Sequence, residues 1–194
     1  MPLGAHEAHE LNELLLSCTN SIQSMALFID QATDPVLRNM ITRHYAVHVQ
    51  DYNMKVEYAN RFSSPDQLNV PAMPMNPPMP AMNAMNAGPQ QYQPLQPQVK
   101  LHQLDDRAIA TSYLLTLKRA GREYAWSAFE CSTPQLRSFL ENAFQMCSHQ
   151  AFEVWQYMAS RGYYAAVPAS QDVLQPMQQM YKSVPEHQPG RLYS

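Results

Sequence analysis

The sequence is poor in several features that mark particular classes of protein. It has only 3 cysteines among 194 residues, an odd number that does not make a disulfide framework. Lys and Arg number 13 against 16 Asp and Glu, which leaves no basic footprint for nucleic acid. No apolar run reaches the ~20 residues that cross a membrane. The N-terminus lacks the basic and apolar regions of a secretory signal. We therefore expect synthesis in the cytosol, no membrane span and no nucleic-acid partner.

The chain does contain an internal duplication. Residues 11–60 align with residues 110–159 at a constant offset of 99 residues. Two copies of one unit joined by a linker set the architecture of such a chain. The identical pairs are Leu15 and Leu114, Leu16 and Leu115, Ala26 and Ala125, Pro35 and Pro134, Leu37 and Leu136, Arg38 and Arg137, and Tyr58 and Tyr157.

Each unit has the pattern of an antiparallel helix pair. Apolar residues recur at i, i+3 and i+4 through the first part of each unit, as on a helix face turned to a core. A break follows at Thr33-Asp34-Pro35, and at Ser132-Thr133-Pro134 in the second unit. Hydroxyl and carboxylate groups cap a new helix there, and proline suits its first position. The pattern predicts four helices, at about 6–31, 35–62, 105–130 and 134–161.

A segment of a different composition separates the two units. Residues 63–103 are rich in Pro, Met, Asn and Gln and almost free of charge, which favours an extended or disordered strip. A crossover of this length in a duplicated four-helix bundle is the ferritin-like arrangement. We therefore predict an all-α, ferritin-like bundle, one domain overall. It comprises a first hairpin at 6–62, the linker at 63–103, a second hairpin at 104–165 and a disordered tail at 166–194.

Three short motifs resemble those of a known family. The run His9-Glu10-Leu11-Asn12-Glu13-Leu14-Leu15, then Asp34-Pro35-Val36-Leu37-Arg38, then a long helix with His44 and His48, resembles the coat F family of bacterial endospore coat proteins. The resemblance covers both helical halves. It implies a ferritin-like structural protein of the spore coat, made in the mother-cell cytoplasm and deposited on the forespore among other coat proteins. It brings no catalytic residue.

Polar residues on the second helix are predicted to point into the core. A helical wheel places His44, His48, Asp51 and Lys55 within the apolar face that begins at Leu37. A pseudo-twofold axis could bring Cys18, His48 and Cys147 into one layer with His44 a turn away, and thiolate with imidazole suits Zn²⁺ or Cu. Alternatively, the cysteines are small buried apolar groups and the histidines hydrogen-bond within the core. We prefer the second interpretation, because the second unit replaces several of these residues.

Other metal or enzyme interpretations have weaker support. The Glu-x-x-His pairs of di-iron proteins are absent, so we predict no enzyme and no cofactor. His6, His9 and Glu13 are expected on the solvated outer face of the first helix, with acidic residues at its start favoured by the helix dipole. The linker methionines could bind Cu(I), but a flexible strip that lies on other protein surfaces explains them as well.

The linker and the tail carry residues that could form covalent cross-links during assembly. Glutamines precede Lys100 in the linker and Lys182 in the tail, and tyrosines such as Tyr92 and Tyr181 lie nearby. Glutamyl-lysine bonds or phenol coupling could form there, whereas Gln-rich segments can also be merely disordered. The sequence thus predicts a structural component of the spore coat that associates with itself and other coat proteins through linker and tail. The alternative function is a ferritin-like metal-binding or redox protein.

Overall fold

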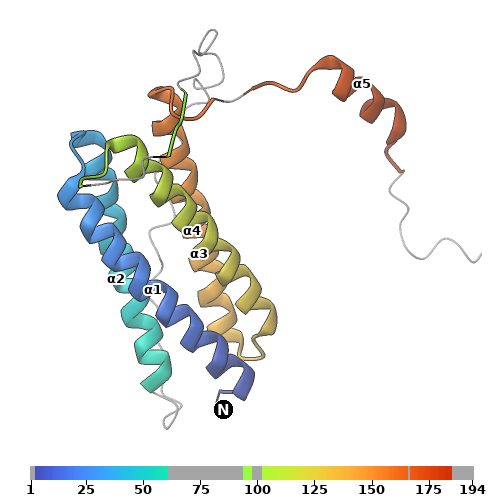
Figure 1. Cartoon of the computed structure of the whole chain (residues 1–194). Coiled ribbons are helices and arrows are strands. Elements are labelled where there is room, and N and C mark those ends of the chain that lie inside the picture. Colours follow the sequence, from blue (N-terminus) through green and yellow to red (C-terminus); the bar gives the residue numbers. More distant parts are fainter. Residues whose placement is uncertain (1–2, 61–93, 98–101, 166, 185–194) are drawn as a thin grey trace, which may run out of the picture.

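The computed structural model describes residues 3–60, 94–97, 102–165 and 167–184. Within these ranges every regular element is a helix: α1 (Ala5–Gln31), α2 (Pro35–Asn60), α3 (Asp106–Glu130), α4 (Pro134–Ser160) and the short α5 (Gln171–Met180). The first four form two hairpins, α1 with α2 and α3 with α4, packed side by side (Figure 1). The predicted all-α class and the four helices are confirmed. The predicted linker at 63–103 and the last residues of the second helix lie almost wholly outside the described ranges.

Side-chain contacts give the relative direction of the helices. Ser17 of α1 bonds Glu123 of α3, and Glu10 bonds Ser127, so α1 and α3 run antiparallel. On α2, by contrast, His44 meets Tyr113 and Lys55 meets Tyr124, so α2 and α3 run parallel. The end of α2 and the start of α3 therefore lie at opposite ends of the bundle, as a long crossover between them requires. The ferritin-like identity of the fold stays a prediction.

The turn between the helices of each hairpin follows the break in the sequence. Pro35 and Pro134 each occupy the first residue of a helix, where no backbone N–H is needed. The Asp34 carboxylate accepts a bond of 2.8 Å from the Val36 N–H and so caps α2 from its own hairpin. Its other oxygen accepts bonds from Tyr157 and Arg161 at the end of α4. One acidic residue thus ties the first turn to the second hairpin.

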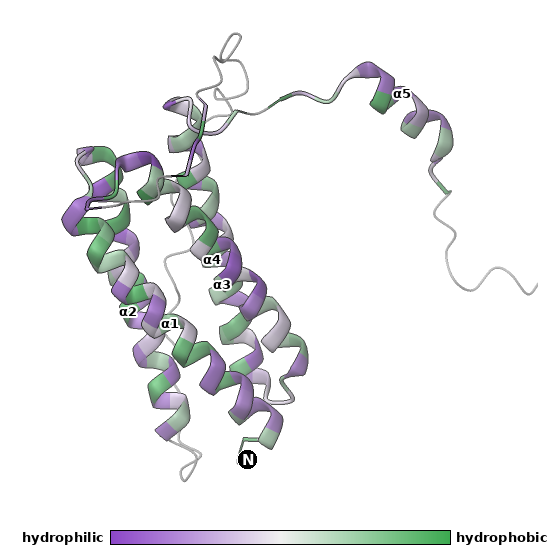
Figure 2. Cartoon of the chain, in the orientation of Figure 1, coloured by the Kyte–Doolittle hydropathy of each residue, from purple (hydrophilic) through white to green (hydrophobic). Residues whose placement is uncertain are grey.

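The core consists of two apolar clusters along the bundle, and each is filled from all four long helices. Every long helix alternates hydrophobic and hydrophilic residues along its length, as amphipathic helices do (Figure 2). Leu114 is 3% exposed, whereas its repeat counterpart Leu15 only borders the core. The apolar residues that are fully enclosed include Met25, Leu37, Ile41, Ile109, Tyr113, Leu117, Leu136, Phe139, Leu140 and Val154.

The tail differs from its prediction. Residues 171–180 form α5 instead of the disordered chain that composition suggests. All its residues are exposed apart from the half-buried Leu174, and it extends away from the bundle beyond the end of α4 (Figure 1). Composition alone does not exclude a helix here, because Gln, Met and Leu all have good helix propensity. Pro176 is the one strong helix breaker in this stretch.

Candidate functional site

A stripe of polar side chains on α2 runs through the bundle core. His44 and His48 are 5% and 3% exposed, and Asp51 and Lys55 are completely enclosed. Steps of four, three and four residues place all four on one helix face, as the wheel predicts. Ionisable groups are almost never fully buried without partners. The function of the stripe therefore depends on what each side chain contacts.

Asp51 and Lys55 form an ion pair one helical turn apart, which Tyr124 of α3 completes. The Lys55 ammonium donates to Asp51 and, over 2.8 Å, to the Tyr124 hydroxyl, which in turn donates 2.5 Å to Asp51. Burial alone would lower the pKa of Lys55, but the adjacent carboxylate outweighs it and holds that pKa above its ordinary value. Lys55 is therefore protonated, with Asp51 Oδ2 and the Tyr124 hydroxyl as its partners, whereas Oδ1 of Asp51 is buried without a hydrogen-bond partner in the described ranges.

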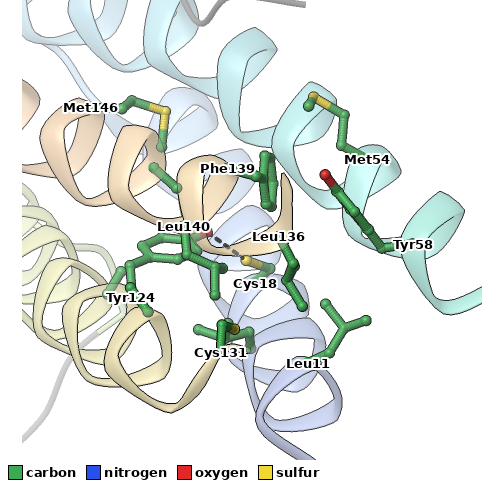
Figure 3. Close-up of a cluster of buried hydrophobic side chains, with 14 of the residues drawn as sticks. Leu11, Cys18, Met54, Tyr58, Tyr124, Cys131, Leu136, Phe139, Leu140 and Met146 are labelled. Atoms are coloured by element: carbon green, nitrogen blue, oxygen red, sulfur yellow. Dashed lines mark hydrogen bonds between the residues drawn. The ribbon is translucent and has the colours of Figure 1, made fainter. Parts of the chain in front are cut away.

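Cys18 lies beside this pair, within the apolar cluster shown in Figure 3. Its sulfur is 3.2 Å from the Tyr124 hydroxyl and 3.6 Å from an oxygen of Asp51. Burial raises the pKa of the Cys18 thiol, and the Asp51 charge adds to this although Lys55 opposes it. A protonated thiol is a poor nucleophile and a poor metal ligand. This environment therefore suits Cys18 to a packing role.

The two histidines have separate partners on the second hairpin. His44 lies 2.9 Å from the Tyr113 hydroxyl through Nδ1 and 2.9 Å from Glu153 through Nε2. Because a carboxylate only accepts, Nε2 is the donor. The bond from His44, reinforced by Arg43, lowers the pKa of Glu153 to about 2. His48 Nε2 lies 2.8 Å from Oε1 of Gln150, and burial lowers the pKa of His48.

The residues singled out as metal candidates are thus divided among different neighbours. Cys18 contacts Asp51 and Tyr124, His44 contacts Glu153, and His48 contacts Gln150. Cys147 is fully enclosed, and burial raises the pKa of its thiol. Over the described ranges, no three His, Cys, Asp or Glu side chains are grouped to hold a metal ion. In the structure these four side chains therefore lie in the core with the partners named above, while the absence of a metal site stays a prediction.

Two acidic residues exchange helix caps between the hairpins. Glu7 of α1 accepts bonds of 2.8 and 2.6 Å from the Ser132 and Thr133 N–H groups at the start of α4. Asp106 of α3 does the same for Thr33 and Asp34 at the start of α2, over 2.8 and 3.0 Å. Glu7 is 2% exposed, whereas His6, His9 and Glu13 of the same helix start are exposed, as expected. The offset of 99 residues pairs Glu7 with Asp106, and this pairing of two acidic residues is the sequence signal from which the exchanged caps could have been found.

The outer face of α1 and α3 carries a groove of about 590 Å³. Its apolar part is formed by Leu16 and Trp126, both 66% exposed. Glu10 and Glu13 line one end, and Arg119 and Arg122 line the other. The sequence does not indicate this groove, because the identity of Leu16 and Leu115 is evidence of the repeat and says nothing of their exposure. Large exposed apolar side chains rimmed by charge are typical of interaction surfaces.

Comparison with known proteins gives a family match over the second hairpin and one similar solved structure. Residues 105–168 match the Coat F domain, which confirms over the second hairpin the resemblance noted in the sequence. A crystal structure of a candidate spore coat protein from Bacillus halodurans C-125 has a TM-score of 0.64 to this chain at 13% identity. The alignment covers 89% of this chain and 98% of that one, so the two share a fold. No curated protein matches the sequence.

In the described part of the chain, none of the helices has the length and apolar character needed to span a bilayer.

Proposed function

We propose, from the premise that residues 105–168 form a Coat F domain, that the protein is a structural component of the bacterial spore coat. The match to that domain is the observation that carries the proposal. The protein is made in the mother-cell cytoplasm and assembles on the forespore with other coat proteins and with copies of itself. We assign it no catalytic role and no cofactor.

The polar groups of the core support a structural role. His44, His48, Asp51 and Lys55 each have a partner on the opposite hairpin, so the stripe joins the two hairpins. Buried polar groups of this kind specify one arrangement of helices even where they add little stability. The stripe thus fixes the register of the scaffold.

Assembly is proposed to depend on segments outside the four-helix bundle. In the tail, Tyr181 and Lys182 are exposed beside the helix that carries Gln171, Gln175, Gln178 and Gln179. In the linker, Gln96 is described and exposed, whereas Lys100, Tyr92 and most of the glutamines lie outside the described ranges. Amides, an amine and phenols accessible in this way can be joined covalently to neighbouring coat proteins.

Localisation and extraction test this function. A fluorescent fusion should surround the forespore during sporulation, and the untagged protein should resist extraction from spore coats by detergent and reductant. A chain truncated after Val167 should keep its helical bundle but become extractable. A diffuse fusion signal in sporulating cells would refute the coat assignment.

Elemental analysis of the purified protein tests the alternative metal-binding function. We expect no stoichiometric metal, and replacement of His44, His48 or Cys147 by apolar residues should leave coat incorporation unchanged. A bound metal lost in these variants, together with failed incorporation, would replace the structural function by the metal-dependent one.

A further inference from the structure

The tail helix α5 is amphipathic, and its apolar side faces solvent. Val173, Met177 and Met180 fall within a narrow arc of the helix, since they are spaced by four and three residues. They are 55%, 53% and 70% exposed. Polar residues, mainly glutamines, occupy the opposite side. The helix therefore presents an apolar stripe with no partner on its own bundle.

A helix of this size is not expected to be stable alone. Isolated helices shorter than about 12 residues are marginal in water, and α5 has 10 residues with Pro176 in its interior. Helical structure in such a segment is normally supported by packing of its apolar face. The sequence of α5 thus implies a surface that receives it.

The groove on α1 and α3 matches α5 in length. Its lining extends from Glu10 to Asn20 along α1, a rise of about 15 Å at 1.5 Å per residue. The 10 residues of α5 have the same length by the same rise. The exposed Leu16 and Trp126 offer an apolar surface to Val173 and Met177, and methionine sulfur packs favourably on aromatic rings.

The charges of groove and tail are ordered in the same way. Asp172 begins α5 and Lys182 follows its end. In the groove, the Arg119 and Arg122 end lies opposite the Glu10 and Glu13 end, because α1 and α3 are antiparallel. When α5 lies with its N-terminus at the arginine end, Asp172 lies near Arg122 and near Arg119, which is paired with Glu123, while Lys182 lies near the carboxylates of Glu10 and Glu13. The opposite direction would bring like charges together at both ends.

We propose that α5 of one copy docks in the α1/α3 groove of a second copy, with its N-terminus toward Arg119 and Arg122. A second copy is favoured because helix and groove are both described in one chain and remain apart there (Figure 1). This contact joins two different surfaces, so it can repeat from copy to copy and build either a ring or an open chain. It rests on the proposed function and names one partner for the tail.

Surface substitutions test the contact in the purified full-length protein. Met177→Asp in the tail, or Leu16→Ser with Trp126→Ser in the groove, should weaken concentration-dependent association in sedimentation at least about tenfold. The matched control is Leu27→Ser with Leu115→Ser. These two leucines are 48% and 58% exposed, Leu115 is the repeat counterpart of Leu16, and neither lines the groove. This control should associate like the wild type, whereas equal weakening would overturn the proposal.

Charge reversal tests the direction of docking. Asp172→Lys should weaken association, and Arg122→Glu in the same chain should restore it, because each contact then pairs the two altered residues of different copies. Weakening that deepens in the double variant would refute the proposed direction.

Disulfide trapping identifies the copy that supplies α5. A chain with Met177→Cys mixed with a chain with Trp126→Cys should form a disulfide-linked dimer under mild oxidation, since the native cysteines are buried. A chain carrying both substitutions should form oligomers. A bond formed only within single monomeric chains would refute docking in a second copy. If association is unchanged in the groove variants while the chain truncated after Val167 still fails to join the coat, the coat function stands and this docking site is wrong.

Discussion

The second helix of each hairpin occupies an equivalent place, yet the two fill the core with different chemistry. On α2 the inward stripe is polar, and two of its members are fully buried charges. On α4 the equivalent positions are apolar or uncharged, and the Coat F match covers this hairpin. The pairs at the offset of 99 residues are His44 and Ala143, His48 and Cys147, Asp51 and Gln150, and Lys55 and Val154.

Two hairpins with the same arrangement of helices can therefore have core residues of different polarity. What a buried polar group requires is a partner at the right place, and here the partners come from the other hairpin. Tyr124 serves Lys55, and Gln150 serves His48. A chain with two unlike halves can place a group on one side and its partner on the other. Exchanging residues between the halves tests this comparison.

Replacing one residue of the α2 ion pair by its α4 counterpart should have the largest effect on the free energy of unfolding. Lys55→Val leaves Asp51 buried without its cation, which should cost about 3 to 5 kcal/mol of unfolding free energy. Asp51→Gln combined with Lys55→Val removes both charges and should recover most of that loss. Urea denaturation followed by circular dichroism measures both. A double variant as unstable as the single one would show that the pair is needed for more than charge balance.

Leu15 and Leu114 are equivalent in the repeat, but their replacement should lower the free energy of unfolding by different amounts. Leu114→Ala removes a side chain that is 3% exposed and should cost about 2 to 5 kcal/mol. Leu15→Ala should cost less, since this counterpart only borders the core. The two thermal unfolding midpoints give the order. Equal losses would indicate that the halves pack alike at this level.

The exchanged caps should contribute less, and in a pH-dependent way. Glu7→Gln should cost about 1 to 2 kcal/mol at neutral pH, and Asp106→Asn less because Asp106 is less buried. Burial raises the pKa of Glu7, but hydrogen bonds from Gly4 and Thr133 outweigh it, so that pKa lies below its ordinary 4.5.

The sign of the acid effect follows from that shift. The stabilisation by Glu7 is complete above pH 4.5 and is lost as the pH falls through the lower pKa of the folded state. The Glu7→Gln variant lacks this loss, so its deficit relative to the wild type should shrink in acid. Urea midpoints between pH 7 and pH 3 measure the deficit, and one that grows in acid would contradict the assignment.

The smallest effects are expected on the outer face. Leu16→Ser and its counterpart Leu115→Ser should change the unfolding free energy by no more than about 0.5 kcal/mol, since both side chains are mainly exposed. Thermal melts of dilute protein measure this. A large loss in either variant would mean that the leucine packs within its own bundle.

Much of the fold could be predicted because its signals are local or repeated. The offset, the apolar spacing and Pro35 and Pro134 located four helices, and the helical wheel placed the stripe of α2 in the core. The partners of the stripe could not be predicted. Tyr113 and Tyr124 lie on an apolar face at helical spacing, where a tyrosine is indistinguishable from any other core residue until the opposite hairpin is placed.

Two further features escaped prediction for different reasons. Glu7 fits the expected bias of a helix start, and only the packing of the hairpins shows that it caps α4 instead. The docking surface on α1 and α3 consists of exposed apolar residues, which single-helix patterns treat as noise. In both cases the information lies in the relation between elements far apart in the chain.

The exchanged caps also determine how the bundle comes apart. Neither hairpin satisfies the backbone of its own turn alone: Glu7 of the first accepts bonds from the turn of the second, and Asp106 of the second accepts bonds from the turn of the first. Separating the hairpins would therefore leave backbone N–H groups in both turns without these partners at once, and would expose the charges of α2. We expect the two halves to unfold in one cooperative transition, and cleavage of the chain between Asn60 and Asp106 to yield two fragments that remain bound rather than two independent domains.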